Sequence, residues 1–217
     1  MNETMRFDEP IRDRLADIPT MSPTSALEYL HEVGSHWSGK GVAVECGSWL
    51  GATCAALAAG LVQAGYDRSI YCYDRWKATH REVAKAGRKV GLAIRRGDNL
   101  EPIFRTYVNP IYAKLETFRG KIEKARWVGE PIEVFLLDAA KHEPAFTRTL
   151  RIFGPSWIPG TTVVGFLDFY YYHKIRGWRQ RMFRCQERFV EKHAGSFERL
   201  HEIGTNAFFR YTKPIAW

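Results

Sequence analysis

Short apolar runs recur along the chain, and longer stretches that mix apolar and charged residues separate them. The runs are GVAVEC, SIYCYD, GLAIRRGD, IEVFLLD and TTVVGFLD, at residues 41–46, 69–74, 91–98, 132–138 and 161–168. Their length and apolar content are typical of buried strands. Because strands here alternate with helical stretches, the pattern predicts a parallel sheet with helices on both faces.

The intervening stretches have the periodicity and the end signals of helices. Helices are expected at 11–16, 22–34, 52–65, 77–90, 143–154 and 176–195, and a longer helical segment at 99–126 is expected to break at Pro110. Ser22 is expected to cap the second of these helices, and Gly65 to end the third.

The last part of the chain has a different pattern. Residues 196–204 and 205–213 predict two strands joined by a tight Gly-Thr-Asn turn, which makes an antiparallel hairpin at a sheet edge. The whole pattern predicts an α/β fold, a doubly wound seven-stranded Rossmann-like sheet with a C-terminal antiparallel hairpin. We expect one domain over 1–217, with a lead-in over 1–22 and a core over 23–217.

Composition narrows the class of protein. The chain is 45% hydrophobic, which excludes a disordered protein, and its net charge of +8 favours either an anionic partner or a basic solvated surface. The four cysteines form no CxxC pair, which indicates reduced thiols in a cytoplasmic protein. The N-terminus lacks a secretory signal, and Glu45 with several glycines interrupts the apolar stretch 42–65, so no membrane helix is expected.

Two glycines mark the junction between the first strand and the following helix. Gly47 and Gly51 would let a ligand approach backbone N–H groups near a helix N-terminus. Their spacing is GxxxG, not GxGxxG, and no Lys-Ser/Thr pair follows, which excludes a Walker loop. Glu45 would repel a pyrophosphate, so this acid favours an amino group or a cation.

Two further acids are expected at neighbouring strand ends. Asp74 ends the second run, where an acid can accept both ribose hydroxyls of a nucleoside, and Asp98 ends the third, where it could accept an adenine amino group. Together with Glu45, these acids suit a ligand that has an amino acid end, a ribose and an adenine. S-adenosylmethionine is such a ligand.

At this point the chain resembles the class I S-adenosylmethionine-dependent methyltransferases over about residues 40 to 213. VECGSWLG is similar to their glycine-rich first motif, YDRW to the ribose-binding second, and RGDN to the adenine-contacting third. The alternative is a doubly wound domain whose glycines serve packing and whose acids lie on the surface. The cofactor contacts that the resemblance implies are Glu45, Gly47, Ser48, Gly51, Asp74, Trp76, Asp98 and Asn99, although Trp76 could equally serve packing.

The fourth and fifth runs end in Asp138 and Asp168. This pair resembles the metal-binding acids of small-molecule O-methyltransferases that act on catechols, caffeoyl-CoA and macrolide sugars, which implies an Mg²⁺ (magnesium) site that lowers the pKa of an acceptor hydroxyl. Those relatives usually carry a second ligand where this chain has Phe169, which cannot coordinate. A hydrogen-bonded role for the acids without a metal is the alternative.

The general base could be Lys141, His142 or His173. The DxxK spacing of Asp138 and Lys141 is similar to the catechol-type base, whereas a histidine titrates nearer neutral pH. Consecutive tyrosines at 170–172 could wall the acceptor pocket, or they could pack in the core.

The function that we expect is S-adenosylmethionine-dependent O-methylation of a small hydroxylated molecule, in particular a sugar or a glycosylated natural product. An RNA methyltransferase and a catalytically inactive cofactor-binding domain are the alternatives. The expected partner is the small-molecule acceptor, a homodimer is open, and neither nucleic acid nor a membrane is the favoured partner.

Overall fold

The computed structural model describes residues 9–80, 82–84 and 92–217, which belong to two compact units. One unit takes in residues up to 37, 48–67 and 75–115, and it holds helices α1, α2, α3 and α5. The other takes in residues 38–47, 68–74 and 116–217, and it holds the sheet with helices α6, α7 and α8.

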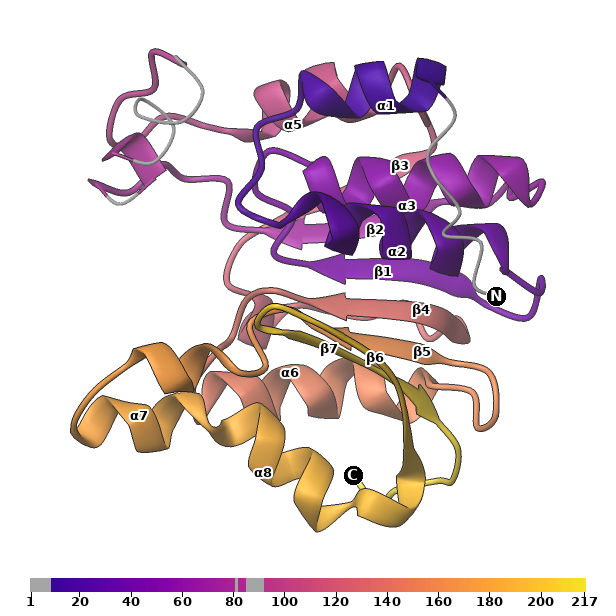
Figure 1. The fold of residues 1–217 in the computed structure, drawn as a ribbon, viewed down its shortest axis with the longest axis vertical. Coiled ribbons are helices and arrows are strands. Elements are labelled where there is room, and N and C mark those ends of the chain that lie inside the picture. The colour runs from indigo at the N-terminus through magenta and orange to yellow at the C-terminus, as the bar shows by residue number, and fades with distance from the viewer. Residues whose placement is uncertain (1–8, 81, 85–91) are drawn as a thin grey trace. The chain divides into compact units, whose positions relative to one another are not determined.

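The sheet has seven strands in the order β3-β2-β1-β4-β5-β7-β6 (Figure 1). Their bounds are β1 Val42–Cys46, β2 Ile70–Asp74, β3 Leu115–Arg119, β4 Ile132–Leu137, β5 Val163–Phe166, β6 Phe197–Ile203 and β7 Asn206–Tyr211. β1 runs parallel to β2 and β4, β4 runs parallel to β5, and β7 is antiparallel to both β5 and β6. The predicted α/β sheet with its C-terminal hairpin is therefore confirmed.

Continuous burial explains why the central strands were recognisable. Every residue of β1 and of β4 is buried, as is typical of parallel strands that are covered on both faces. In the sheet unit, α6 (Ala145–Phe153) and α8 (Cys185–Lys192) pack on the strands through Phe146, Leu150, Phe153 and Val190. Burying each such side chain stabilises the fold by about 1.5–3 kcal/mol.

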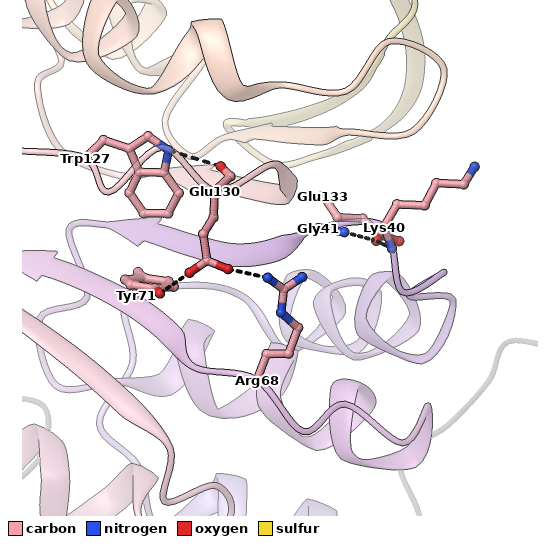
Figure 2. Close-up of polar contacts among 7 residues, drawn as sticks. All are labelled: Lys40, Gly41, Arg68, Tyr71, Trp127, Glu130 and Glu133. Carbon is pink, nitrogen blue, oxygen red and sulfur yellow. Dashed lines mark hydrogen bonds and ion pairs between the residues drawn. The ribbon is translucent and has the colours of Figure 1, made fainter.

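A buried acid fastens the start of β1. Glu133 is only 4% exposed, and Oε2 accepts the backbone N–H groups of Lys40 at 2.8 Å and Gly41 at 3.0 Å, as Figure 2 shows. Its other oxygen accepts the N–H of Ser38. One carboxylate from β4 thus satisfies three backbone donors of the segment that enters β1.

A second acid joins the neighbouring segments at the same end of these strands. The Glu130 carboxylate accepts the Tyr71 hydroxyl and pairs with Arg68, and its carbonyl accepts the Trp127 indole N–H at 3.1 Å (Figure 2). Both residues of the Arg68–Glu130 pair are about one-third exposed, so this ion pair should stabilise the fold less than the buried hydrogen bonds of Glu133 do.

The helical unit is built on a close contact between α2 (Thr24–Ser35) and α3 (Ala52–Gln63). A Cβ added at Gly60 would lie 2.0 Å from the carbonyl oxygen of His31, and one at Gly34 would lie 2.4 Å from that of Leu57. The two backbones therefore touch where only glycine fits. α1 (Glu9–Ala16) and α5 (Glu101–Val108) are the remaining helices whose bounds lie in this unit.

Several predicted elements are confirmed and others are wrong. α3 ends before Gly65, whose φ of 77° suits the predicted helix stop. Ser22 does not cap α2, because Pro23 occupies the cap position without a side-chain bond. The helix predicted at 176–195 is two helices, α7 (Trp178–Phe183) and α8, separated at Arg184. Part of the helix predicted at 77–90 lies outside the described residues.

The predicted third strand is wrong. Residues 92–95 form no strand, and the third strand of the sheet is β3, which lies inside the segment predicted to be helical. In β3 only Leu115 is buried, so this edge strand lacks the apolar run of a central strand. Phe118 holds it by stacking on Tyr73, with ring centroids 4.6 Å apart.

Short 3-10 helices complete the described elements: η1 Ile122–Lys124, η2 Gly154–Ser156, η3 Tyr171–Lys174 and η4 Ala194–Ser196. Among the residues that the structure describes, each helix is too short or too polar to span a lipid bilayer.

Candidate active site

The carboxyl ends of the central parallel strands meet at one edge of the sheet. The N–H of Gly47, just after β1, donates to the carbonyl of Tyr73 at 2.7 Å, which places Gly47 beside the end of β2. The N–H groups of Asp138 and Ala139, just after β4, donate to the carbonyl of Cys46 at 2.9 and 3.1 Å. The loop residues after β1, β2 and β4 are therefore neighbours, as the sequence predicted.

Gly47 is required by close packing at this edge. Its φ is +104°, and an added Cβ would lie 2.9 Å from the backbone nitrogen of Ala139 and 3.1 Å from the carbonyl carbon of Asp138. The position thus needs glycine even before a ligand is considered. In the helical unit, Gly51 has a φ of +97°, and an added Cβ would meet Val108 and Phe104 of α5.

Asp74 ends β2 with β3 beside it. The carbonyl of Asp74 accepts the N–H of Gly120 at 2.8 Å, so Gly120, which directly follows β3, lies beside the end of β2. Sequence reasoning missed this segment because RRGD at 95–98 offers the same Arg-Gly pair with an acid after it.

Asp98 and Asn99 end no strand of the sheet. The backbone at Asp98–Leu100 pairs instead with Trp76–Ala78, through the bonds of Ala78 N–H to Asp98 and of Leu100 N–H to Trp76. The Asp98 carboxylate accepts the N–H of Arg95 at 2.7 Å within an exposed turn. The predicted adenine contact at Asp98 depended on its position at the end of the third strand. Asp98 does not lie there, so this reason for the contact no longer applies.

Trp76 is fully buried within the helical unit. Its indole N–H donates to the carbonyl of Trp49 at 3.0 Å, and its ring lies 5.2 Å from that of Phe104. This arrangement favours the packing alternative for Trp76. Ser48 is also buried, and its hydroxyl has no hydrogen-bond partner among the described residues, which suits a residue that awaits a ligand.

The acids after β4 and β5 converge on one lysine. Lys141 Nζ lies 2.9 Å from Asp138 Oδ1 and makes a still shorter contact with Asp168 Oδ2. The hydroxyl of Thr205 donates to Asp168 Oδ1 at 3.0 Å, and the N–H of Asp168 donates to Asn206 Oδ1 at 3.0 Å. Figure 1 shows the two strands side by side in the sheet, which is why residues so far apart in sequence meet.

Asp138 and Lys141 have shifted pKa values. Burial raises the pKa of Asp138 more than the Lys141 ammonium lowers it, and Asp168 raises it further. Burial lowers the pKa of Lys141, but the charges of Asp138 and Asp168 and the hydrogen bonds to them outweigh burial and raise it. Lys141 is therefore a protonated cation at neutral pH and a poor general base.

Comparison with known proteins identifies the chain at this point. Residues 44–165, more than half of the chain, match a protein family described as a methyltransferase domain. The chain belongs to this methyltransferase family.

No curated protein gives a significant match, but solved structures share the fold. The O-methyltransferase NovP is 16% identical, with a TM-score of 0.60 over 86% of this chain and 79% of that one. CalS11, a TDP-rhamnose 3′-O-methyltransferase of calicheamicin biosynthesis, is 14% identical, with a TM-score of 0.59 over 98% and 89%. A putative RNA methyltransferase from Pyrococcus horikoshii is 12% identical, with a TM-score of 0.55 over 96% and 100%. At these identities the likeness shows the fold alone.

The residues of this methyltransferase fit S-adenosylmethionine in part. In the sheet unit, Glu45 and Asp74 lie at the ends of β1 and β2, near Gly47, and their negative charge suits the cofactor's amino group and ribose hydroxyls. In the helical unit, the buried Ser48 hydroxyl offers one further polar group. These contacts stay predictions.

The acid pair of this methyltransferase does not fit a divalent metal. The Lys141 ammonium touches both carboxylates, and Asp168 is also bonded by Thr205. Phe169, at the position of the missing ligand, is 1% exposed and packs on Phe209 at 5.3 Å. The Mg²⁺ site that the resemblance implied therefore has a protein cation where the ion would bind.

Each of the two candidate histidines lies beside aromatic rings. His142 follows Lys141 and is exposed, with its ring 6.2 Å from Phe183 of α7, and Tyr171 lies 6.0 Å from the same ring. His173 is exposed, and its ring packs at a tilt on that of Tyr172, with the ring centroids 4.1 Å apart. Both histidines stay candidates for the base.

The consecutive tyrosines do not form one wall. The Tyr170 hydroxyl donates to Glu202 and accepts from Arg199, whereas Tyr172 is buried and donates to Glu187 at 2.6 Å. Only Tyr171 pairs with Phe183 beside His142, so it is the tyrosine that suits an acceptor contact.

Proposed function

We propose that the protein is an S-adenosylmethionine-dependent O-methyltransferase that acts on a hydroxyl group of a small molecule, with a sugar or a glycosylated natural product as the favoured acceptor. The observation that carries the proposal is the charged cluster of Asp138, Lys141 and Asp168 at the sheet edge where Gly47 lies. Charged hydrogen-bonding groups suit an oxygen nucleophile, and the O-methyltransferase neighbours support the same reaction.

The cofactor contacts of the sheet unit are assigned by chemistry. Asp74 would accept the ribose hydroxyls and Glu45 would attract the amino group of the cofactor, while the backbone at Gly47 lies close to both strand ends. Gly120, which follows the true third strand, takes the place that Asp98 had in the sequence prediction. Ser48, Gly51 and Asn99 stay predicted contacts of the helical unit.

S-adenosylmethionine would supply a methyl group on a sulfonium for transfer to the acceptor oxygen, and S-adenosylhomocysteine would be the product that leaves. The acceptor hydroxyl must also lose its proton, because an alcohol is a weak nucleophile at neutral pH. His142 would accept this proton, since Lys141 is held protonated and His142 is the exposed histidine beside it. Tyr171 and Phe183 would contact the acceptor ring.

Two measurements test this function. Calorimetry with S-adenosylhomocysteine should show binding, and the absence of binding would overturn the cofactor assignment. Methyl transfer from labelled S-adenosylmethionine should then be measured against nucleotide sugars, glycosides, catechols and amines. Transfer to amines alone, with no hydroxylated acceptor modified, would contradict O-methylation.

The second candidate is an RNA methyltransferase. The net charge of +8 and the putative RNA methyltransferase among the fold neighbours favour it. A gel shift with structured RNA at physiological salt separates the two functions, because a small-molecule enzyme should show no retained complex. Tight cofactor binding without turnover of any acceptor would instead favour an inactive cofactor-binding domain.

A further inference from the structure

The contacts of Lys141 with Asp138 and Asp168 indicate a further role for this lysine. This inference rests on the proposed O-methyltransferase function. We propose that the Lys141 ammonium takes the place of a divalent metal: it pairs with both Asp138 and Asp168, compensates one of their two negative charges, and binds the acceptor oxygen. The enzyme then methylates its acceptor without a metal ion.

The geometry supports this substitution. An ammonium has three N–H donors, and Lys141 directs two of them at the acids, one at Asp138 Oδ1 at 2.9 Å and one at Asp168 Oδ2. The side chains of Lys141, Asp138 and Asp168 keep 29%, 29% and 26% of their surface exposed. Among the described residues Nζ has these two partners, so under this proposal its third donor is the one that would bind the acceptor oxygen.

The surroundings of Asp168 hold it toward lysine without a metal. The hydroxyl of Thr205 occupies Oδ1, and Asn206 accepts the backbone N–H, so the β6–β7 turn fixes the orientation of this acid. Its φ of 79° turns the chain so that the next residue, Phe169, enters the core. Mg²⁺ requires near-octahedral oxygen coordination, which a cluster with two carboxylates already engaged by lysine does not provide.

Charge compensation makes the proposal testable. With Lys141 charged, the cluster carries one net negative charge, whereas without it the two carboxylates face each other uncompensated. Two converging carboxylates without a counter-charge make a cation site. Removing the lysine should therefore create the metal site that the wild-type protein lacks.

The experiment measures Mn²⁺ binding by electron paramagnetic resonance and calorimetry. The wild-type protein should bind no stoichiometric Mn²⁺, and Lys141→Ala should bind one ion at least about tenfold more tightly. The double variant Lys141→Ala/Asp168→Asn should lose this binding. Lys174→Ala, which removes an exposed lysine from η3, is the matched control and should behave like wild type. Lys141→Met serves as a second variant that keeps the apolar stem, with melting curves to confirm folding.

The outcomes separate this inference from the proposed function. Stoichiometric Mn²⁺ binding by wild type that Asp138→Asn abolishes would overturn the substitution, and so would folded Lys141→Ala and Lys141→Met that bind no more Mn²⁺ than wild type. Wild-type turnover should also survive exhaustive chelation, and loss of turnover that added Mg²⁺ restores would overturn the inference. Failure of S-adenosylhomocysteine to bind would overturn the proposed function instead, while the Mn²⁺ result would stand.

Discussion

Replacing Glu133 with glutamine should destabilise the sheet unit strongly, although the two side chains have nearly the same shape. The carboxylate accepts N–H groups from Ser38 on one oxygen and from Lys40 and Gly41 on the other. A glutamine has one acceptor oxygen. If that oxygen faces Lys40 and Gly41, its NH₂ group meets the N–H of Ser38, and two donors then face each other.

The magnitude follows from the number of bonds affected. A hydrogen bond to a charged group contributes about 1.5–3 kcal/mol, and a buried donor left without a partner costs about 1–3 kcal/mol. Glutamine loses one bond outright and the charge of the other two, so we expect Glu133→Gln to lower the free energy of unfolding by about 2–4 kcal/mol. The total free energy of unfolding of a typical domain is only about 5–15 kcal/mol, so a loss of this size is large.

Urea unfolding followed by circular dichroism measures the effect, and Glu130→Gln provides the control. Glu130 lies at the same end of the strands, but its side chain is 33% exposed and pairs with Arg68, which is also exposed (Figure 2). We expect that variant to lose less than about 1 kcal/mol. If Glu133→Gln lost no more than Glu130→Gln, the three-donor argument would be refuted. Affinity for S-adenosylhomocysteine should stay unchanged at temperatures where the variant is folded. Glu133 lies near the start of β4, whereas Glu45 and Asp74 lie at the opposite ends of β1 and β2.

Two further predictions concern the ligands. Asp74→Ala should weaken S-adenosylhomocysteine binding by about 1.5–3 kcal/mol, or roughly 10- to 150-fold, because a charge-assisted hydrogen bond to the ribose is lost. Calorimetry measures this affinity, and an unchanged value would show that Asp74 does not contact the cofactor. His142→Ala should lower kcat by about 10²- to 10⁴-fold while cofactor affinity stays the same. Steady-state kinetics over several pH values measures kcat. If the variant keeps the wild-type kcat, His142 is not the base, and His173 is the next residue to test.

The central strands could be predicted from the sequence because strands that are buried on both faces appear as continuous apolar runs. β1 and β4 are buried at every position, so their apolar runs were visible without tertiary information. β3 left no such trace, since only its first residue is buried and Phe118 is held by Tyr73, a residue from another strand. The stability of an edge strand depends on contacts with the neighbouring strand, and a short window of sequence does not contain those residues.

The candidate site was predictable in its acids but not in its cation. DxxK spacing placed Lys141 near Asp138, and strand ends placed Asp168 near both. Asp138 and Asp168 together raise the pKa of Lys141 and keep it a cation, and the direction of Asp168 is set by Thr205 and Asn206 in the hairpin turn. Contacts from residues nearly 40 positions away therefore help to place this lysine between two carboxylates.

Phe169 explains why this cluster has a lysine at its centre. Its ring lies 6.1 Å from Phe166 and 5.3 Å from Phe209, inside the hydrophobic core of the sheet unit. The positive φ of Asp168 sends the acid toward Lys141 and the next side chain inward, so a ligand at 169 would have to leave the core to reach the acids. A protein oxygen ligand at position 169 is thus excluded by packing as well as by residue type. The number of acids alone does not exclude a metal, because waters can complete the coordination of Mg²⁺. The Lys141 ammonium, which contacts both Asp138 and Asp168, is what occupies the position between them.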